Sequence, residues 1–278
     1  MEHFSVLMSV YGKENALSLD KALYSVLINQ TVKPTEIILV EDGPLTDELL
    51  CVIKKYKNTF QQFQSIKLPQ NRGLGTALNI GLQQCHYEWI ARMDSDDISL
   101  PQRFEKQLNY LIAHPDTDVL GCAIGEFEHD EHSIVSLKIC PAIINNYIKL
   151  RSPVNHPTVF FRKSSVLKAG GYQHCYHMED YHLWIRMYAM GMRITSLQEV
   201  LYLFKMNTDT QKRRGGWQYI QSELKIQKLM LNLNIITIPR YIFNIIIRCS
   251  GKLLNQHLRS LLYKTMFRKS TNNVLNIQ

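Results

Sequence analysis

Three carboxylates crowd into four residues of the sequence, at Asp94, Asp96 and Asp97. They follow an apolar run at residues 89–93, which is typical of a buried strand, and precede a segment with helical spacing. Neighbouring ionised carboxylates repel one another unless a positive charge neutralises them. Mg²⁺ or Mn²⁺ suits this task, because hard divalent cations prefer carboxylate oxygen and share their shell with substrate phosphates. The alternative is a solvated turn in which Asp97 or Ser99 caps the next helix.

Two other turns carry side chains that suit a nucleotide. Asp42 follows the apolar run 36–40, where its carboxylate could accept hydrogen bonds from a base N–H or a ribose hydroxyl. A turn aspartate that bonds its own backbone explains Asp42 equally well. Arg72 opens a predicted helix over 73–85, where it could pair with phosphate beside the helix N-terminus. A surface arginine in a glycine-containing turn is the alternative for Arg72.

A further pair of acids, Glu179 and Asp180, heads an amphipathic helix predicted over 180–190. An acid at this position is either a helix cap or a catalytic base. His174, His177 and His182 lie nearby in the sequence. Their spacings of three and five residues match no common zinc pattern, so we interpret them as loop histidines.

Strand-like and helix-like segments alternate four times in the first part of the chain. The predicted strands are 4–10, 36–40, 66–68 and 89–93, and the predicted helices are 15–29, 46–57, 73–85 and 99–114. This order favours a mostly parallel sheet with helices on both faces. Ligands of such sheets collect at the carboxyl ends of the strands, which is where the acids above fall. After Gly121 the pattern is less regular, with a strand predicted over 158–162.

Five segments in the same order resemble the family 2 glycosyltransferases, which have the GT-A (Rossmann-like) α/β fold. The resemblance covers about residues 4–206 and is greatest to bacterial members that build surface polysaccharides. It rests on SVLMSVY at 5–11, IILVEDG at 37–43, NRG at 71–73 with Ala77, Asn79 and Gly81, ARMDSDD at 91–97 with PQR at 101–103, and EDYHLWIR at 179–186.

This resemblance implies roles for individual residues on the donor side. Asp42 matches the aspartate that reads uracil, and Ser9 and Tyr11 fall where the first loop packs on the nucleotide. Arg72 is a candidate diphosphate or base contact. Glu41 departs from the family, since many relatives have a second aspartate there, but it keeps the charge.

The resemblance also assigns the metal and the base. Asp94 and Asp96 match the DxD pair, with Asp96 the direct ligand of Mn²⁺ or Mg²⁺ and Asp94 nearer the ribose. Asp180 matches the general base of an inverting reaction, in which an α-linked donor gives a β-linkage. Glu179 and His156 are candidate acceptor-site residues. The implied partners are a nucleotide-sugar donor, with UDP favoured, and a lipid-diphosphate-linked saccharide as the acceptor.

Charge is distributed unevenly along the 278 residues. Residues 212–278 contain 12 Lys/Arg and one acid, a net charge of +11, whereas residues 1–211 carry −3. Six scattered cysteines without a CxxC pair, and a strand that begins at Phe4 with no targeting segment before it, predict a reduced cytosolic compartment. The chain has no run of 18 apolar residues, which predicts no membrane-spanning helix.

The basic segment predicts an amphipathic helix over 241–264. Its narrow polar stripe contains Asn244, Arg248, Lys252, Asn255 and Arg259, and its broad face is Ile- and Leu-rich. We expect this helix to attach the protein to the anionic inner face of the plasma membrane, with Pro239 and Arg240 breaking its apolar lead-in. The alternative is a helix packed on the catalytic domain.

The predicted organisation is a catalytic domain over 1–210, with a nucleotide-binding half over about 1–122 and an acceptor half over about 123–210, and a basic helical extension over 211–278. A sugar nucleotidyltransferase is an alternative enzyme, but it requires a glycine-rich cationic phosphate loop after the first strand, and residues 11–14 (YGKE) are poor for this purpose. A nucleic-acid binder is a further alternative. It predicts aromatic residues among the basic ones of the tail, where Ile and Leu predominate, so we expect no nucleic acid.

Overall fold

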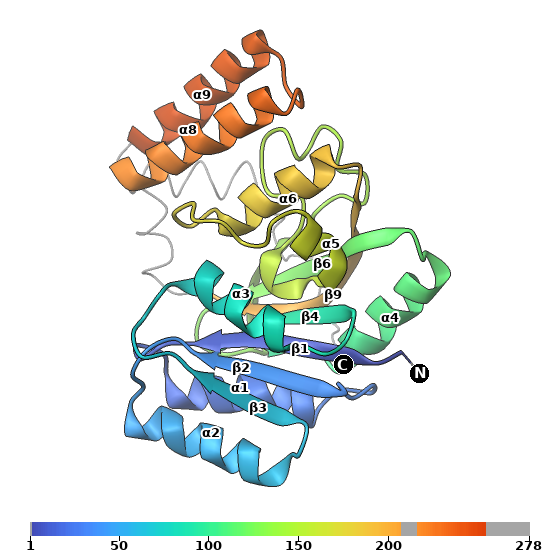
Figure 1. The fold of residues 1–278 in the computed structure, drawn as a ribbon, viewed down its shortest axis with the longest axis vertical. Coiled ribbons are helices and arrows are strands. Elements are labelled where there is room, and N and C mark those ends of the chain that lie inside the picture. Colours follow the sequence, from blue (N-terminus) through green and yellow to red (C-terminus); the bar gives the residue numbers. More distant parts are fainter. Residues whose placement is uncertain (1, 207–215, 254–278) are drawn as a thin grey trace.

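The computed structural model describes residues 2–206 and 216–253, which form a sheet with helices on both faces (Figure 1). The first elements are β1 (Phe4–Val10), α1 (Ala16–Leu27), β2 (Glu36–Glu41), α2 (Asp47–Thr59), β3 (Phe63–Lys67), α3 (Leu74–Gln84), β4 (Trp89–Asp94), β5 (Ile98–Ser99) and α4 (Arg103–Ala113). The remainder are β6 (Thr117–Phe127), β7 (Ile134–Lys138), a 3₁₀ turn (His156–Thr158), β8 (Phe160–Arg162), α5 (Lys163–Lys168), α6 (Glu179–Ala189), β9 (Arg193–Lys205), α8 (Trp217–Asn232) and α9 (Ile238–Leu253).

The sheet confirms the predicted parallel arrangement in its first half. Its order is β3-β2-β1-β4-β8-β6-β9-β5, and β3, β2, β1 and β4 pair in parallel. The second half is mixed, because β8 runs antiparallel to both β4 and β6 whereas β9 is parallel to β6. The predicted boundary at residue 122 falls inside β6, a strand buried along nearly its whole length.

Apolar residues on both faces explain why the central strands are buried. Alternate residues of β1 enter two separate cores: Met8 joins the core beneath α1, α2 and α4, and Leu7 joins the core shared with α3 and α6. Helix α3 approaches the sheet at Gly81, where an added Cβ would lie 2.5 Å from Leu7 Cδ1 and 2.7 Å from Val40 Cγ2. The absence of a side chain at Gly81 therefore allows α3 to pack close to β1 and β2.

The first two helices, α1 and α2, begin at side-chain caps that the sequence provides. Asn15 accepts a hydrogen bond from the backbone N–H of Ser18 at 3.1 Å, and α1 follows. Thr46 caps α2 in the same way, with Asp47 and Glu48 in the first turn, where acids favour the helix dipole. Because each helix starts a few residues after a strand, the strand-end loops are short.

Three predicted boundaries are wrong. The third strand is Phe63–Lys67 rather than 66–68, because polar residues are tolerated on this edge strand. The helix predicted from Ser99 begins at Arg103, since Ile98 and Ser99 instead form β5 and pair with Leu203 and Tyr202 of β9. The strand predicted over 158–162 is Phe160–Arg162 and follows a 3₁₀ turn.

The C-terminal helices α8 and α9 lie side by side, beyond α6 and at the opposite end of the molecule from α2 (Figure 1). Helix α8 shares the core of α6 through buried Ile226 and Met230. Pro239 does not break the lead-in as predicted, because it lies in the first turn of α9, where its missing N–H costs no helical hydrogen bond. The predicted helical stretch beyond residue 253 lies outside the described residues. Over 2–206 and 216–253, the structure contains no helix with the length and hydrophobicity needed to cross a bilayer.

Candidate active site

The ends of three adjacent strands bring the predicted donor residues together. Ser9 pairs with Asp94 in the register of β1 and β4, and Val10 pairs with Glu41 of β2. Asp42 follows directly, with its backbone N–H bonded to the Val10 carbonyl at 2.8 Å. The parallel register therefore places Ser9, Asp42 and Asp94 at one edge of the sheet, and Tyr11 follows β1 at the same edge.

Asp42 joins two loops of this edge. One carboxylate oxygen accepts from the backbone N–H of Arg72 at 2.7 Å, and the other accepts from the N–H of Gly73 at 3.0 Å. The donors thus belong to the segment that leads into α3 rather than to the turn of Asp42 itself, which contradicts the interpretation as a self-bonding turn aspartate. Gly43 has φ +91° and lies against the Asn71 backbone, where an added Cβ would be 2.6 Å from the Asn71 nitrogen. The Arg72 side chain is exposed.

Asp94 is held by a buried cation. Arg92, two residues earlier on β4 and 1% exposed, forms an ion pair with Asp94 through Nη2 and Oδ1. Burial alone would lower the pKa of Arg92, but the adjacent Asp94 raises it above its ordinary value. The Tyr202 hydroxyl accepts a hydrogen bond from the Asp94 backbone N–H at 3.2 Å. The ion pair and the backbone hydrogen bond therefore hold Asp94 in a fixed position.

Asp96 is crowded by other acids. Burial and the negative charges of Asp94 and Glu14 together raise the pKa of Asp96 to about 7. Glu14 reaches this loop from the end of β1, where it accepts a hydrogen bond from Ser95 Oγ at 3.1 Å. No group of three or more potential metal ligands is preassembled within the described parts of the chain. A hard divalent cation fits this donor set, because it would relieve the carboxylate repulsion that raises the pKa of Asp96.

Asp97 differs from Asp94 and Asp96 in its burial and in its hydrogen-bond partner. It is completely buried, and its Oδ1 accepts from the backbone N–H of Lys205 on β9 at 2.7 Å. Burial raises the pKa of Asp97, as do Asp96 and Asp94. Neither Asp97 nor Ser99 caps the next helix, because α4 begins after Gln102. The solvated-turn interpretation is therefore wrong, and the three acids divide into a half-buried pair, Asp94 and Asp96, and a buried anchor to β9, Asp97.

The second predicted pair of acids begins α6. Ser152 Oγ donates to Asp180 Oδ2 at 3.3 Å. Asp180 keeps part of its surface exposed, yet burial of its carboxyl raises its pKa, against the lowering effects of the Tyr181 N–H, Lys138, Arg92 and Ser152. Arg92 therefore acts electrostatically on both Asp94 and Asp180, which lie on different elements.

Glu179 packs against the first turn of α3. An added Cβ on Gly75 would lie 3.2 Å from Glu179 Cγ. Burial and the negative charge of Asp180 together raise the pKa of Glu179 to about 7. The two neighbouring acids thus occupy different surroundings.

His156 begins the 3₁₀ turn before β8 and is partly exposed. Its Nε2 is 2.9 Å from the Tyr172 hydroxyl, and its ring contacts the rings of Tyr172 and Trp184. Burial lowers the pKa of His156 well below its usual range, and the charge of Arg92 lowers it further, so the imidazole is neutral. His182 is not a loop histidine as interpreted from sequence, because it is buried within α6.

Sequence reasoning missed four residues that organise this site: Arg92, Glu14, Ser152 and Tyr172. Arg92 was visible within the ARMDSDD segment, where a cation alternates with Asp94 on one face of a strand predicted to be buried. The other three come from distant loops, and no local pattern indicates their contacts.

Comparison with known proteins identifies the family. Residues 5–171 match the family described as Glycosyl transferase family 2. The amylovoran biosynthesis glycosyltransferase AmsE of Erwinia amylovora is 38% identical over 262 residues, which cover 94% of this chain and 98% of AmsE. The chain belongs to glycosyl transferase family 2. This family 2 glycosyltransferase is also 39% identical over 268 residues to the UDP-Gal:alpha-D-GlcNAc-diphosphoundecaprenol beta-1,3-galactosyltransferase of Escherichia coli, with 96% of this chain and 97% of that enzyme covered.

Solved structures confirm the GT-A fold of this family 2 glycosyltransferase. S. aureus TarS 1–349 in complex with UDP-GlcNAc matches 95% of this chain and 76% of its own at a TM-score of 0.66 and 19% identity. The mannosyltransferase PcManGT of Pyrobaculum calidifontis, in complex with GDP-Man and Mn²⁺, matches 95% of this chain and 79% of its own at a TM-score of 0.63 and 14% identity. At these identities the likeness concerns the fold alone.

Proposed function

We propose that the protein is an inverting glycosyltransferase that moves a sugar from a UDP-sugar to a hydroxyl of a lipid-diphosphate-linked saccharide, during synthesis of a bacterial surface polysaccharide such as O-antigen, capsule or exopolysaccharide. The observation that carries this proposal is the shared influence of Arg92 on Asp94 of the donor edge and Asp180 of α6. The Escherichia coli relative, whose name specifies UDP-Gal and a diphosphoundecaprenol-linked acceptor, supports the choice of both substrate classes.

The donor nucleotide would bind along the ends of β1, β2 and β4. Asp42, already fixed by two backbone N–H groups, has further lone pairs that can accept from the uracil base. Ser9 and Tyr11 would contact the nucleotide from the end of β1. The exposed guanidinium of Arg72 would pair with the diphosphate or the base. In this proposal residues of about 1–122 bind the nucleotide and residues of about 123–210 bind the acceptor.

Asp96 and Asp94 would hold a Mn²⁺ or Mg²⁺ ion together with the donor diphosphate. Glu14 adds negative charge beside them. The ion supplies electrostatic stabilisation to the departing nucleoside diphosphate. The protein contributes the geometry, because Arg92 and Tyr202 fix Asp94, and Asp97 anchors the loop to β9.

Asp180 would act as the general base. The acceptor oxygen forms a bond to the anomeric carbon as the bond from that carbon to the diphosphate oxygen breaks, and Asp180 takes the hydroxyl proton. A single displacement of this kind inverts the anomeric centre. The raised pKa of Asp180 makes it a stronger base than an exposed aspartate, while the Arg92 charge and the Ser152 hydrogen bond limit that rise.

Glu179 and His156 would line the acceptor site beside this base. The neutral imidazole of His156, bonded to Tyr172, can donate or accept a hydrogen bond to a sugar hydroxyl but adds no charge. A lipid-linked acceptor requires the enzyme at a membrane, so we propose peripheral attachment of the extension over 211–278 to the anionic cytoplasmic face of the plasma membrane.

A donor screen tests this function. The purified protein is incubated with Mn²⁺, a synthetic lipid-diphosphate sugar and a panel of UDP-sugars, and the products are read by mass spectrometry. We expect one donor to extend the acceptor by one sugar. Failure of every nucleotide-sugar, with a protein that is folded by circular dichroism, would overturn the proposal.

A further inference from the structure

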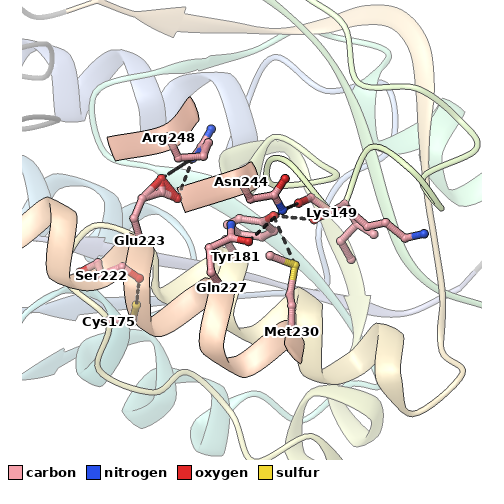
Figure 2. Close-up of polar contacts among 10 residues, drawn as sticks. Lys149, Cys175, Tyr181, Ser222, Glu223, Gln227, Met230, Asn244 and Arg248 are labelled. Atoms are coloured by element: carbon pink, nitrogen blue, oxygen red, sulfur yellow. Dashed lines mark hydrogen bonds and ion pairs between the residues drawn. The ribbon is translucent and has the colours of Figure 1, made fainter. Parts of the chain in front are cut away.

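Helix α9 turns its polar side toward the protein. Asn244 is completely buried, and its Nδ2 donates to the Lys149 carbonyl and to Gln227 Oε1, both at 2.9 Å. One turn further on, Arg248 forms two hydrogen bonds with the buried Glu223 of α8, at 2.8 and 2.9 Å (Figure 2). Asn244 and Arg248 of the polar stripe, which the sequence analysis expected on a membrane-bound helix, therefore lie in the contact between α9 and the rest of the protein.

The apolar residues of α9 point outward as a consequence. Ile238 is 64% exposed, Ile242 53%, Phe243 49% and Ile246 62%. Their spacing of three and four residues forms one continuous stripe along the helix. A surface helix that faces water normally buries its apolar side and exposes its polar side, and α9 does the reverse. An exposed apolar surface of this kind marks an interaction site.

A cationic cavity lies at the start of the same helix. It has a volume of about 480 Å³ and is lined by Asn146, Lys149, Ile235, Ile236, Thr237 and Arg240. The Arg240 guanidinium lies 5.3 Å from the ring centroid of Phe243 in the apolar stripe, and its buried Nε lacks a hydrogen-bond partner. Among the described residues that line this cavity none is acidic, so Lys149 and Arg240 make it suited to an anion.

We propose that the apolar stripe of α9 (Ile238, Ile242, Phe243 and Ile246) inserts into an anionic phospholipid surface, with a lipid phosphate in the cavity between Lys149 and Arg240. The stripe and the cavity both involve α9. The apolar side chains of the stripe would therefore enter the boundary between lipid headgroups and acyl chains, at the same place where Lys149 and Arg240 would meet the lipid phosphates. The stripe and the cavity are thus the surface through which the proposed peripheral attachment would occur. The inference rests on the proposed function, which supplies the lipid-linked acceptor as the reason for membrane binding.

Charge favours lipid over a second copy of the chain as the occupant. Residues 249–278 contain five Lys/Arg and no acid, and the whole chain has a formal net charge of +8. Two copies of the chain therefore repel one another, whereas an anionic bilayer attracts each of them.

Vesicle co-sedimentation of the full chain at low salt tests the apolar stripe. The vesicles contain phosphatidylcholine with or without phosphatidylglycerol. We expect Ile242→Ser/Ile246→Ser to lower the partition coefficient on phosphatidylglycerol vesicles by about tenfold or more, since interfacial binding scales with buried apolar area. The matched control is Leu17→Ser/Ile112→Ser, which changes residues of similar exposure, 65% and 59%, on α1 and α4 and should bind as the wild type does.

A second variant tests the cavity. Lys149→Gln/Arg240→Gln should weaken binding to phosphatidylglycerol vesicles and leave binding to pure phosphatidylcholine unchanged. Wild-type binding by Ile242→Ser/Ile246→Ser would overturn the proposal. So would analytical ultracentrifugation showing that this variant only separates a dimer while vesicle binding persists.

Activity on a short-chain, water-soluble acceptor separates this proposal from the proposed function. The Ile242→Ser/Ile246→Ser variant should keep full activity there, because its changes lie on the outer face of α9. A wild-type protein that is inactive on every acceptor would count against the proposed function and leave the vesicle result standing.

Discussion

Arg92 and Asp94 lie two residues apart on the same face of β4 and form an ion pair beneath the donor edge. The guanidinium is 1% exposed, and two of its nitrogens, Nε and Nη1, have no hydrogen-bond partner. Its positive charge also lowers the pKa of Asp180 and of His156. A single buried cation thus acts on the proposed donor ligand, the proposed base and the proposed acceptor-site histidine.

We predict that Arg92→Met moves the acid limb of the kcat/KM profile to higher pH. Asp180 must be ionised to act as a base, and loss of the Arg92 charge raises its pKa further. Each unit of that rise lowers the ionised fraction about tenfold on the acid side of the profile. Arg92→Lys should restore part of the shift. Arg193→Met, which removes a surface ion pair with Asp116, is the control, and an unshifted profile for Arg92→Met would exclude the electrostatic role.

The metal prediction concerns Asp96. EDTA should abolish sugar transfer, and Mn²⁺ or Mg²⁺ should restore it. Asp96→Asn should lose most of the activity and also bind Mn²⁺ more weakly in the presence of UDP, as measured by electron paramagnetic resonance. Asp116→Asn, at an exposed ion pair, should behave as the wild type does. Full turnover in EDTA would contradict the assignment.

Asp180 and Glu179 should respond differently to loss of charge. Asp180→Asn keeps the shape and removes the base, so transfer should fall by a factor of ~10² or more while UDP binding remains. Glu179→Gln should retain much of the activity, because a pKa of about 7 means that a protonated carboxyl is already populated near neutral pH. The opposite ranking in initial-rate assays would move the base to Glu179.

Gly81→Ala should destabilise the protein by about 1–3 kcal/mol, as overpacking does in a close-packed core. The new methyl group would lie 2.5 Å from Leu7 Cδ1 and 2.7 Å from Val40 Cγ2, so these side chains or α3 must move within the core. Urea unfolding measures the change in the free energy of unfolding. Gln83→Ala, at an exposed position of the same helix, should change it by less than about 0.5 kcal/mol.

The pairing of α8 with α9 predicts a stability effect in the C-terminal helices. Arg248→Met leaves the fully buried Glu223 without its partner, which should cost about 3 kcal/mol. The double variant Glu223→Leu/Arg248→Met removes both charges and should recover most of that loss. Thermal unfolding of the two variants checks this, and equal stability of wild type and Arg248→Met would show that the pair contributes nothing.

The sequence was sufficient for the parallel half of the fold and for the proposed donor edge. Continuous apolar runs such as that of β1 identify buried strands, and the acids Asp42 and Asp94 follow two of them, so the topology alone brings them together. The acceptor side was not predictable in this way. The contact of Ser152 with Asp180 spans 28 residues and leaves no local pattern.

The sequence also did not predict which face of α9 packs against the protein. Amphipathic periodicity identifies which residues of α9 share a face, but not which face meets the protein. Glu223 of α8 decides this, because a buried carboxylate requires a partner and Arg248 supplies it. The apolar face is thereby left outside, which the distribution of charge in the sequence did not indicate.

The anomeric configuration of the product tests the central claim most directly. The proposed function requires one displacement at the anomeric carbon of a UDP-sugar, with Asp180 taking the proton of the acceptor hydroxyl. The product of the donor identified by the screen is purified, and its new linkage is examined by proton NMR. An α-linked UDP-hexose should give a β-linkage, and Asp180→Asn should form this product more slowly by a factor of ~10² or more. An α-linkage in the product would contradict the single displacement and the role of Asp180 as its base.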